Sequence, residues 1–353
     1  MKLGLIIYGS LETLSGGYLY DRRMVMSLRA HGDTVEVISL PWKGYLAHLG
    51  HNLRFRLPPG LDLLIQDELA HASLLAANQF PHPCPVVSLV HHLRASEPRP
   101  AWQNRFYRLF ETRYLRSVDG FIFNSQTTRG AVQALVGQKA PFVVAYPPTD
   151  RFGQALPEGS VTARAKEPGP LRVLFLGNLI PRKGLHTLIE AIGRLRLAVE
   201  LEVVGSLTFD PAYAQRMQRM AAGTGPDARV RFHGALDQDR LAALLETCHV
   251  LAVPSSYEGF GIVYLEGMAF GLPAIGTTLG AAGEIIAHGE TGFLVPPEDP
   301  HALATCLERL SRDRETLTRL SVNALERYRR QPAWDETAGE LRAFLQRMHG
   351  WRP

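Results

Sequence analysis

Apolar runs of strand length alternate with amphipathic stretches of helix length along the first 150 residues. The runs are rich in Val, Ile, Leu and Phe, and Gly, Pro or polar residues bound them, which is typical of buried strands. Residues 17–31 and 101–117 have apolar positions at helical spacing instead. The pattern predicts an α/β domain with strands at residues 3–8, 34–40, 61–66, 85–90, 120–125 and 142–148.

The same alternation starts again after residue 170 and ends in helical sequence after residue 300. It predicts strands at residues 172–178, 201–205, 230–234, 249–255, 274–278 and 292–297. The predicted fold class is α/β, with two Rossmann-like, doubly wound parallel sheets facing a cleft. The predicted parts are domains at 1–150 and 171–330, a Pro- and Gly-rich linker at 151–170, and a C-terminal helix, 331–353, that packs back across the domains.

Length and composition agree with two domains of ordinary size, because 353 residues with 46% hydrophobic content can form a core in each. The cysteines are three in number and far apart, which favours a reducing compartment over a disulfide framework. The opening apolar run is too short for a membrane span and lacks the profile of a signal peptide. We therefore expect a cytoplasmic protein, either free or peripheral at the membrane.

The stretch SSYEGFGIVYLEGMAFGLPAIG, residues 255–276, holds two carboxylates in otherwise apolar or small surroundings. Glu258 falls in a strand-to-helix loop, and the helical N–H groups near Ile262 and Val263 are free to bind an anion. Glu266 lies one turn into a helix that looks mostly buried, so it needs hydrogen-bond donors, and sugar hydroxyls are suitable. The plainer alternatives are that Glu258 is a solvated loop residue and that Glu266 is an exposed position on an amphipathic helix.

A second signal is the loop LGNLIPRKGLHTL, which carries two cations just before a helix that Gly184 opens. Arg182 and Lys183 oppose the helix dipole there, so the arrangement favours a bound anion such as a diphosphate. Only five of the 38 basic residues are lysines, which suggests that a compact ammonium is required at this point. We expect Lys183 to lie on an exposed loop and to bind this anion. The alternative is a solvated basic loop that binds no ligand.

In the N-terminal half, Gly16 and Gly17 lie between the first strand and its helix, but they lack the G-x-G-x-x-G spacing of a dinucleotide site. The sequence PVVSLVHHLRASEP places His91 and His92 at the carboxyl edge of a buried strand. Because ligands of such sheets bind at that edge, His91 is a candidate for substrate contact, with a structural role as the alternative.

These motifs resemble the retaining glycosyltransferases of family 4, which have the GT-B fold and an E-x7-E motif. The resemblance covers nearly the whole chain through SGG, VHH, PRKG, AVPSSYEGFGIVYLEGMAFGLPAIG and GETGFLVPPEDP. It implies that Glu258 contacts hydroxyls of the donor hexose and that Glu266 holds the ribose of the nucleotide. It also implies that the amides around Gly259, Phe260 and Gly261 line the sugar pocket.

The resemblance gives further roles to the basic, the glycine and the histidine motifs. Arg182 and Lys183 would neutralise the diphosphate, Gly16 and Gly17 would cover it, and His91 would lie beside the anomeric centre. One departure is Asn178, because the family often has arginine there. The predicted catalytic residues are His91 and Glu258, and the predicted donor-binding residues are Gly16, Gly17, Asn178, Arg182, Lys183, Glu258, Gly259, Phe260, Gly261, Ile262, Val263 and Glu266.

The leaving nucleoside diphosphate needs either a metal ion or fixed cations and helix dipoles. The chain supplies cations, and its one D-x-D, Asp237 and Asp239, opens a helix where Asp is an ordinary cap. We therefore predict neither a metal nor a cofactor besides the nucleotide-sugar donor. As in similar enzymes, retention would come from front-face attack by the acceptor, with the departing phosphate taking its proton.

Three other functions are compatible with a GT-B chain: a nucleotide-sugar epimerase, a phosphorylase, and a catalytically silent sugar-nucleotide binder. Release of nucleoside diphosphate from a donor would separate the silent binder from the enzymes. A Rossmann dehydrogenase is disfavoured, because the dinucleotide fingerprint is absent.

Charge is divided unevenly, since residues 1–165 carry 17 basic and 12 acidic residues and residues 166–353 carry 21 and 22. The excess gathers at Lys43, Arg54 and Arg56, and in the helix at 102–117. That helix interleaves basic and aromatic residues: Arg105, Arg108, Arg113 and Arg116 with Phe106, Tyr107, Phe110 and Tyr114. The pattern favours an anionic membrane surface and a lipid or lipid-linked acceptor.

Three alternatives to the membrane interpretation stay open or are weaker. The aromatic residues of 102–117 could pack on the N-terminal sheet and leave the arginines in water. The acceptor could be a soluble small molecule. Nucleic acid is a weaker explanation, because no nucleic-acid module accompanies the basic stretches.

Overall fold

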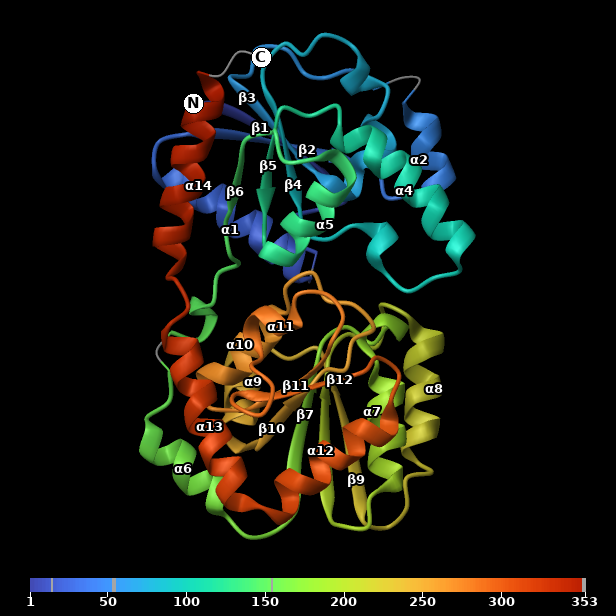
Figure 1. Ribbon diagram of the computed structural model, residues 1–353, viewed down its shortest axis with the longest axis vertical. Coiled ribbons are helices and arrows are strands. Elements are labelled where there is room, and N and C mark those ends of the chain that lie inside the picture. Colours follow the sequence, from blue (N-terminus) through green and yellow to red (C-terminus); the bar gives the residue numbers. More distant parts are fainter. Residues whose placement is uncertain (14, 53–54, 154, 351–353) are drawn as a thin grey trace. The chain divides into compact units, whose positions relative to one another are not determined.

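The computed structural model describes residues 1–13, 15–52, 55–153 and 155–350, and it consists of two compact units (Figure 1). The first unit is Met1–Pro148 together with the chain from Pro332 onward, and the second is Thr149–Gln331. Each unit is an α/β structure with one six-stranded parallel sheet. Each of the twelve strand predictions overlaps an observed strand, and the predicted fold class is confirmed.

The first unit has the strand order β2-β1-β3-β4-β5-β6. Every adjacent pair is parallel, and the central strands are buried throughout, as β3 and β4 show. Helices on both faces shield such a sheet from water, which explains why its strands read as continuous apolar runs. The strands are β1 (Lys2–Tyr8), β2 (Thr34–Leu40), β3 (Leu63–Asp67), β4 (Val86–Val90), β5 (Gly120–Phe123) and β6 (Phe142–Val144).

Two groups of helices supply the core of the first unit. One face of the sheet packs on α1 and α14, and the other packs on the helices that follow β3, β4 and β5. The helices are α1 (Gly16–Ala30), α2 (Tyr45–His51), α3 (His71–Leu74), α4 (Ala101–Leu115), α5 (Gln126–Val136) and α14 (Trp334–His349), with short 3-10 turns η1 (Glu68–Ala70), η2 (Ala77–Gln79) and η3 (Arg94–Ser96).

The C-terminal helix α14 belongs to the first unit, although most of the chain before it belongs to the second. Phe344 and Leu345 are buried in the core that α14 shares with α1, and the two helices lie side by side (Figure 1). Arg342 donates from Nε to Oδ2 of Asp33 at 2.7 Å, and Asp33 is 5% exposed. The guanidinium of Arg342 and the terminal amine hold the pKa of Asp33 low, despite its burial.

The second unit has the strand order β12-β11-β10-β7-β8-β9, again with parallel pairs only. This order reverses beside β7 and β10, and in such sheets ligands bind at the carboxyl ends of the strands near the reversal. The strands are β7 (Leu171–Leu176), β8 (Val199–Val204), β9 (Ala228–Gly234), β10 (Val250–Ala252), β11 (Ala274–Thr277) and β12 (Gly292–Val295).

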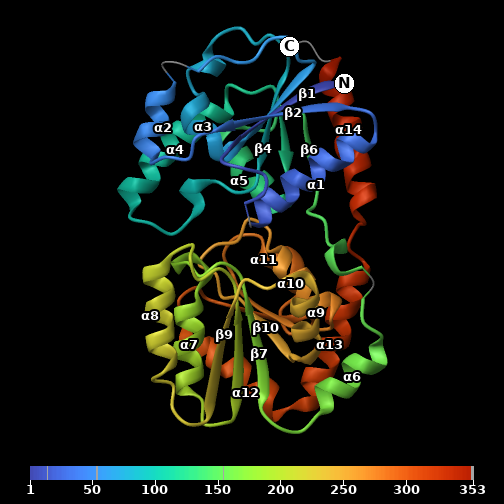
Figure 2. The ribbon, with the colours of Figure 1, turned by 180° about the vertical axis from the view of Figure 1, so that it is seen from behind.

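Eight helices and two 3-10 turns of the described residues surround this second sheet. Helices α7 and α8 pack on each other, as both ribbon views show (Figures 1 and 2). The elements are η4 (Asp150–Phe152), α6 (Glu158–Lys166), η5 (Pro181–Lys183), α7 (Leu185–Arg194), α8 (Pro211–Ala221), α9 (Gln238–Thr247), α10 (Ile262–Ala269), α11 (Ala282–Ile285), α12 (Pro300–Arg312) and α13 (Arg314–Arg329).

The segment 151–170 was expected as a linker, but it contains the packed helix α6. Val161 is fully buried, and Arg164 donates from Nη2 to the carbonyl oxygen of Phe270 at 2.6 Å. The Pro and Gly residues of segment 151–170 delimit η4 and α6 and do not mark a flexible linker. The unit boundary lies before this segment, at residues 148 and 149.

Among the described residues, no helix combines the length and the apolar character that crossing a membrane requires.

Candidate functional site

The loop between β10 and α10 forms the centre of the candidate site in the second unit. Gly261 ends this loop with a φ of 93° and caps α10, and a Cβ there would lie 2.6 Å from the ring of Tyr264. Only glycine fits this position without strain. The loop carries the predicted residues Gly259, Phe260 and Gly261 to the start of α10, where Ile262 and Val263 are partly exposed and Phe260 is buried.

Glu258 lies in this loop and is 5% exposed. Its Oε1 accepts a hydrogen bond from Nζ of Lys183 at 2.5 Å and another from Oγ of Ser255 at 2.7 Å. Burial alone would raise the pKa of this carboxyl. The cations Lys183 and Arg182, with the two hydrogen bonds, outweigh burial and lower the pKa to about 2. Glu258 is therefore a fixed anion, and the interpretation as a solvated loop residue is excluded.

Lys183 ends η5, and its side chain is 15% exposed. The expectation of an exposed loop was wrong, because the loop folds onto residues 255–258 and the ammonium is buried against Glu258. Burial lowers the pKa of Lys183, and Glu258 opposes this shift. Arg182 donates from Nη1 to the carbonyl oxygen of Tyr257 at 2.8 Å, so both cations hold the same loop.

Glu266 is buried inside the second unit, on helix α10. Its carboxylate is 2% exposed and accepts a hydrogen bond from Nη1 of Arg151 at 3.1 Å. Burial raises the pKa of Glu266, and Arg151 opposes this shift only in part. The prediction that this helix is mostly buried is confirmed. Arg151 was missed, because it lies 115 positions away in a segment interpreted as a linker.

Two other residues of the second unit have simple roles in the structure. Asn178 follows β7, and its carbonyl oxygen accepts a hydrogen bond from the N–H of Ile180 at 2.9 Å, which shapes the turn into η5. Asp237 caps α9, since its Oδ1 accepts from the N–H of Arg240 at 2.9 Å. Its role as a helix cap, expected from the sequence, is confirmed.

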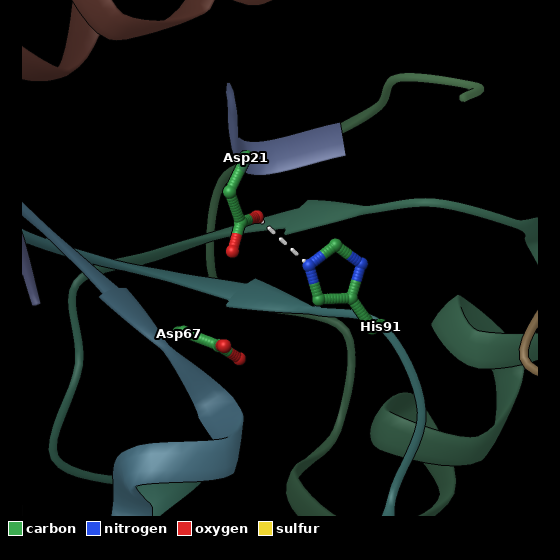
Figure 3. A group of neighbouring side chains, drawn as sticks. All are labelled: Asp21, Asp67 and His91. Atoms are coloured by element: carbon green, nitrogen blue, oxygen red, sulfur yellow. Dashed lines mark hydrogen bonds and ion pairs between the residues drawn. The ribbon is translucent and has the colours of Figure 1, made fainter. Parts of the chain in front are cut away.

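The remaining predicted residues come together in the first unit. His91 follows β4, and its Nε2 lies 2.9 Å from Oδ1 of Asp21 on α1 (Figure 3). Gly17 lies against the imidazole, because a Cβ there would be 3.3 Å from Cδ2 of His91. Gly16 is the first residue of α1, whose cap is Ser15. His92 lies 2.9 Å from Glu97 through its own Nε2.

Two buried groups of the described residues have ligand atoms close enough for a metal ion: Asp21, Asp67 and His91, and Glu68, His71 and Glu111. Sequence reasoning missed both groups and considered only the D-x-D. Asp67 could have been found, since it ends a strand run beside His91. In both groups the histidine is already hydrogen-bonded, as His71 contacts the hydroxyl of Tyr45 at 2.9 Å through Nε2.

Comparison with known proteins shows which family the second unit resembles. The family model described as "Glycosyl transferases group 1" matches residues 162–327. A D-inositol 3-phosphate glycosyltransferase of Corynebacterium glutamicum is 34% identical over 174 residues, which are 48% of this chain and 41% of that protein. The chain spans about half the length of the first curated relatives that it matches. The matched segment, a little under half of the chain, is similar to the group 1 glycosyltransferases.

Two further likenesses concern a lipid-acting relative and the fold. A GDP-mannose-dependent alpha-(1-6)-phosphatidylinositol monomannoside mannosyltransferase of Mycobacterium tuberculosis is 30% identical over 243 residues, 64% of this chain and 61% of that protein. A sucrose-phosphate synthase structure from Thermosynechococcus elongatus has a TM-score of 0.80 at 22% identity and covers 99% of both chains. The fold is of the GT-B type, as the motifs predicted.

The buried ion pair generates a prediction about stability. Lys183→Ala leaves Glu258 buried without its cation, so the free energy of unfolding should fall by about 3–5 kcal/mol. Glu258→Gln in the same chain removes the uncompensated charge and should restore part of the loss. Urea denaturation of the single and double variants measures this coupling, with Lys166→Ala on the surface of α6 as control. Additive effects would show that the two side chains do not interact.

The contact behind Glu258 generates a second prediction. Gly280 has a φ of 78°, and a Cβ there would lie 2.1 Å from the carbonyl oxygen of Glu258. Gly289 has a φ of 79° with nothing near its Cβ position. Gly289→Ala should therefore lower the free energy of unfolding by about 1 kcal/mol, for backbone strain, and Gly280→Ala by roughly 1–3 kcal/mol more, for the clash. Equal midpoints in thermal unfolding would contradict this difference.

Proposed function

We propose that the protein transfers a hexose from a nucleotide-diphosphate sugar to an acceptor hydroxyl, with retention of configuration and without a metal ion. The observation that carries the proposal is the contact of Lys183 with Glu258 at the start of α10, inside the segment that matches the group 1 glycosyltransferases. A cation that can bind phosphate and an anion that can accept sugar hydroxyls lie side by side there. This is the pair of charges that a sugar diphosphate needs.

Each glutamate of the E-x7-E motif has its own polar partner in the second unit. Glu258 is paired with Lys183, and Glu266 is paired with Arg151. On the proposed function, sugar hydroxyls add donors to Glu258, ribose hydroxyls add donors to Glu266, and the diphosphate competes with Glu258 for Lys183. The amides around Gly259 and Gly261 and the start of α10 complete the donor site.

His91, Gly16 and Gly17, which lie in the first unit, keep the roles that the family resemblance implies for them. Gly17 packs on the imidazole, and His91 follows the carboxyl end of β4, where ligands of parallel sheets bind. On the proposal, His91 contacts the sugar beside the bond that breaks. The nucleoside diphosphate leaves with its charge stabilised by Lys183, Arg182 and the helix N-termini. Asn178 takes the place of a charged contact.

Turnover in the presence of a chelator tests the reaction and its independence of metal. Incubation with a panel of nucleotide-diphosphate sugars should release nucleoside diphosphate at nearly the same rate with or without excess EDTA, because fixed cations stabilise the leaving group. Glu258→Ala should reduce turnover strongly, whereas Lys166→Ala should leave it unchanged. No release from any donor with any acceptor would favour a silent binder. Loss of activity in EDTA and recovery with Mg²⁺ or Mn²⁺ would contradict the electrostatic mechanism.

We further propose that the acceptor is a lipid or lipid-linked glycan and that the first unit docks on the cytoplasmic leaflet. A groove of about 840 Å³ follows α4, and Arg105, Arg108, Arg113 and Arg116 line it. Each of these arginines is exposed, and none pairs with a carboxylate among the described residues. Such a groove fits anionic headgroups, since each basic residue near an anionic membrane contributes about 1 kcal/mol.

The apolar residues that would enter the membrane interface differ from those predicted. Tyr114 is buried, and Phe106, Tyr107 and Phe110 pack with Tyr45 of α2, so these aromatic residues contact protein. Other large apolar side chains on these two helices and the loop before α2 are instead exposed, by 61–74%: Trp42, Leu46, Trp102 and Leu109. Lys43 and Arg56 are exposed as well, while Arg54 lies outside the described residues.

Liposome co-sedimentation tests the docking surface. Vesicles that contain anionic phospholipid should bind the protein at low salt and release part of it at moderate salt. Arg105→Glu/Arg108→Glu should abolish binding, because it reverses charge in the groove. Arg219→Glu/Arg229→Glu makes the same charge change on the surface of the second unit and should bind normally. Absence of binding under both salt conditions would favour a soluble acceptor.

A further inference from the structure

Two buried carboxylates and one half-buried imidazole of the first unit meet at the carboxyl edge of its sheet. Asp21 comes from α1, Asp67 ends β3, and His91 follows β4 (Figure 3). One polar atom of each lies within 4.8 Å of the others. The two aspartates are 0% and 3% exposed, so both carboxylates lie away from bulk water. Only His91 was assigned a role above.

The contact of His91 with Asp21 determines which ring nitrogen of the imidazole is available to a ligand. An ionised carboxylate can only accept, so Nε2 of His91 carries the proton in their 2.9 Å hydrogen bond. The other ring nitrogen, Nδ1, has no partner among the described residues. The ring cannot turn freely, because Gly17 lies against one side and Tyr20 packs edge-on at 5.4 Å. Nδ1 is therefore the nitrogen available to a ligand.

The second carboxylate explains the charge of this group. Oδ2 of Asp21 is buried without a hydrogen-bond partner and lies on the side of Asp67 (Figure 3). Asp67 accepts through Oδ1 from the N–H of Leu69 at 2.9 Å. Two buried carboxylates this close are strongly destabilised when both are ionised, unless a proton or a cation lies between them. The unpartnered oxygen therefore indicates a shared proton.

We propose that Asp21 is a positioning residue that fixes His91 through Nε2. Asp21 and Asp67 share a proton beside the imidazole, and Nδ1–H of His91 is thereby presented to an oxygen of the sugar nucleotide. This inference rests on the proposed function for the identity of the ligand. The working form holds two protons more than a neutral ring with two carboxylates: one on Nδ1 of His91, in addition to the proton on Nε2, and one between the aspartates, so the cluster is neutral. Loss of one proton leaves a buried net charge.

The charges around the imidazole agree with this assignment. Burial alone would lower the pKa of His91, but Asp21, Asp67 and Glu68 raise it above the ordinary value. Burial and the charge of Asp21 raise the pKa of Asp67 to about 7, against the effect of His91. The titratable groups that face the cluster are Asp21, Tyr18 and Tyr20 of α1, Tyr8 of β1, Asp67 of β3, Glu68 of η1 and Tyr114 of α4.

Nitrogen-15 NMR of the histidine rings tests the inference without any substrate. His91→Gln assigns the signal of His91. In the unmodified protein, His91 should lose its proton above the ordinary pKa of about 6.5, with a second inflection from the coupled titration of Asp67, and the neutral ring should carry its proton on Nε2. Asp21→Asn should move the midpoint of the His91 titration to lower pH, so that the proton concentration at the midpoint rises at least tenfold. Asp67→Asn should remove the second inflection.

Tyr20→Phe is the matched control, because Tyr20 contacts the same ring and its hydroxyl has no hydrogen-bond partner in the described structure. It should leave the titration unchanged. If Asp21→Asn fails to fold, the titration and tautomer of the unmodified protein still decide. A His91 that titrates below 6.5, a neutral ring protonated on Nδ1, or line broadening by micromolar Mn²⁺ would overturn the proposal.

Donor turnover separates this inference from the proposed function. In Asp21→Asn, turnover should fall at least tenfold, and its alkaline limb should move to lower pH, while Tyr20→Phe keeps the normal profile. Turnover with an unshifted profile in Asp21→Asn would overturn the positioning role and leave the glycosyltransferase function standing. The expected NMR titration in a protein that turns over no donor would support the cluster and overturn the enzyme.

Discussion

The arrangement of the proposed donor site depends on one buried ion pair, Lys183 with Glu258. Neither charge is stable alone in its surroundings, so the chain segments that carry them have to fold together. Lys183 belongs to the turn after β7 and Glu258 to the loop after β10, and these strands are neighbours in the sheet. The pair thus fixes the loops that follow these two neighbouring strands relative to each other at the carboxyl ends of the strands.

The same constraint shapes how a ligand can bind. Both glutamates of the motif already have a cationic partner within the chain, so their charges are satisfied by protein groups. A ligand gains binding energy only to the extent that its hydroxyls and phosphates replace or extend these contacts. A sugar diphosphate carries both kinds of group, whereas a free sugar or a free phosphate carries one. On the proposed function, this pairing favours the whole donor over either of its parts.

Local patterns predicted the fold well and the site in part. The strands were readable because a parallel sheet that is covered on both faces leaves apolar runs in the sequence. The burial of Glu266 was readable from its apolar neighbours. The burial of Lys183 was not, because it results from contact with a loop 75 positions away. Arg151 and Asp21 were missed for the same reason, since tertiary partners so distant leave no periodicity or spacing to read.

The path of the backbone has a consequence for how the two units depend on each other. The chain leaves the first unit at residue 148 and returns at residue 332, so the second unit is an insertion within the first. The inserted unit is one continuous piece of chain. The first unit, which is the host, is split in the sequence. Its last helix, α14, packs on α1 and β6 only after the inserted unit has been synthesised. The host can complete its core only when the whole guest has been synthesised, which makes it the later of the two to mature on a ribosome.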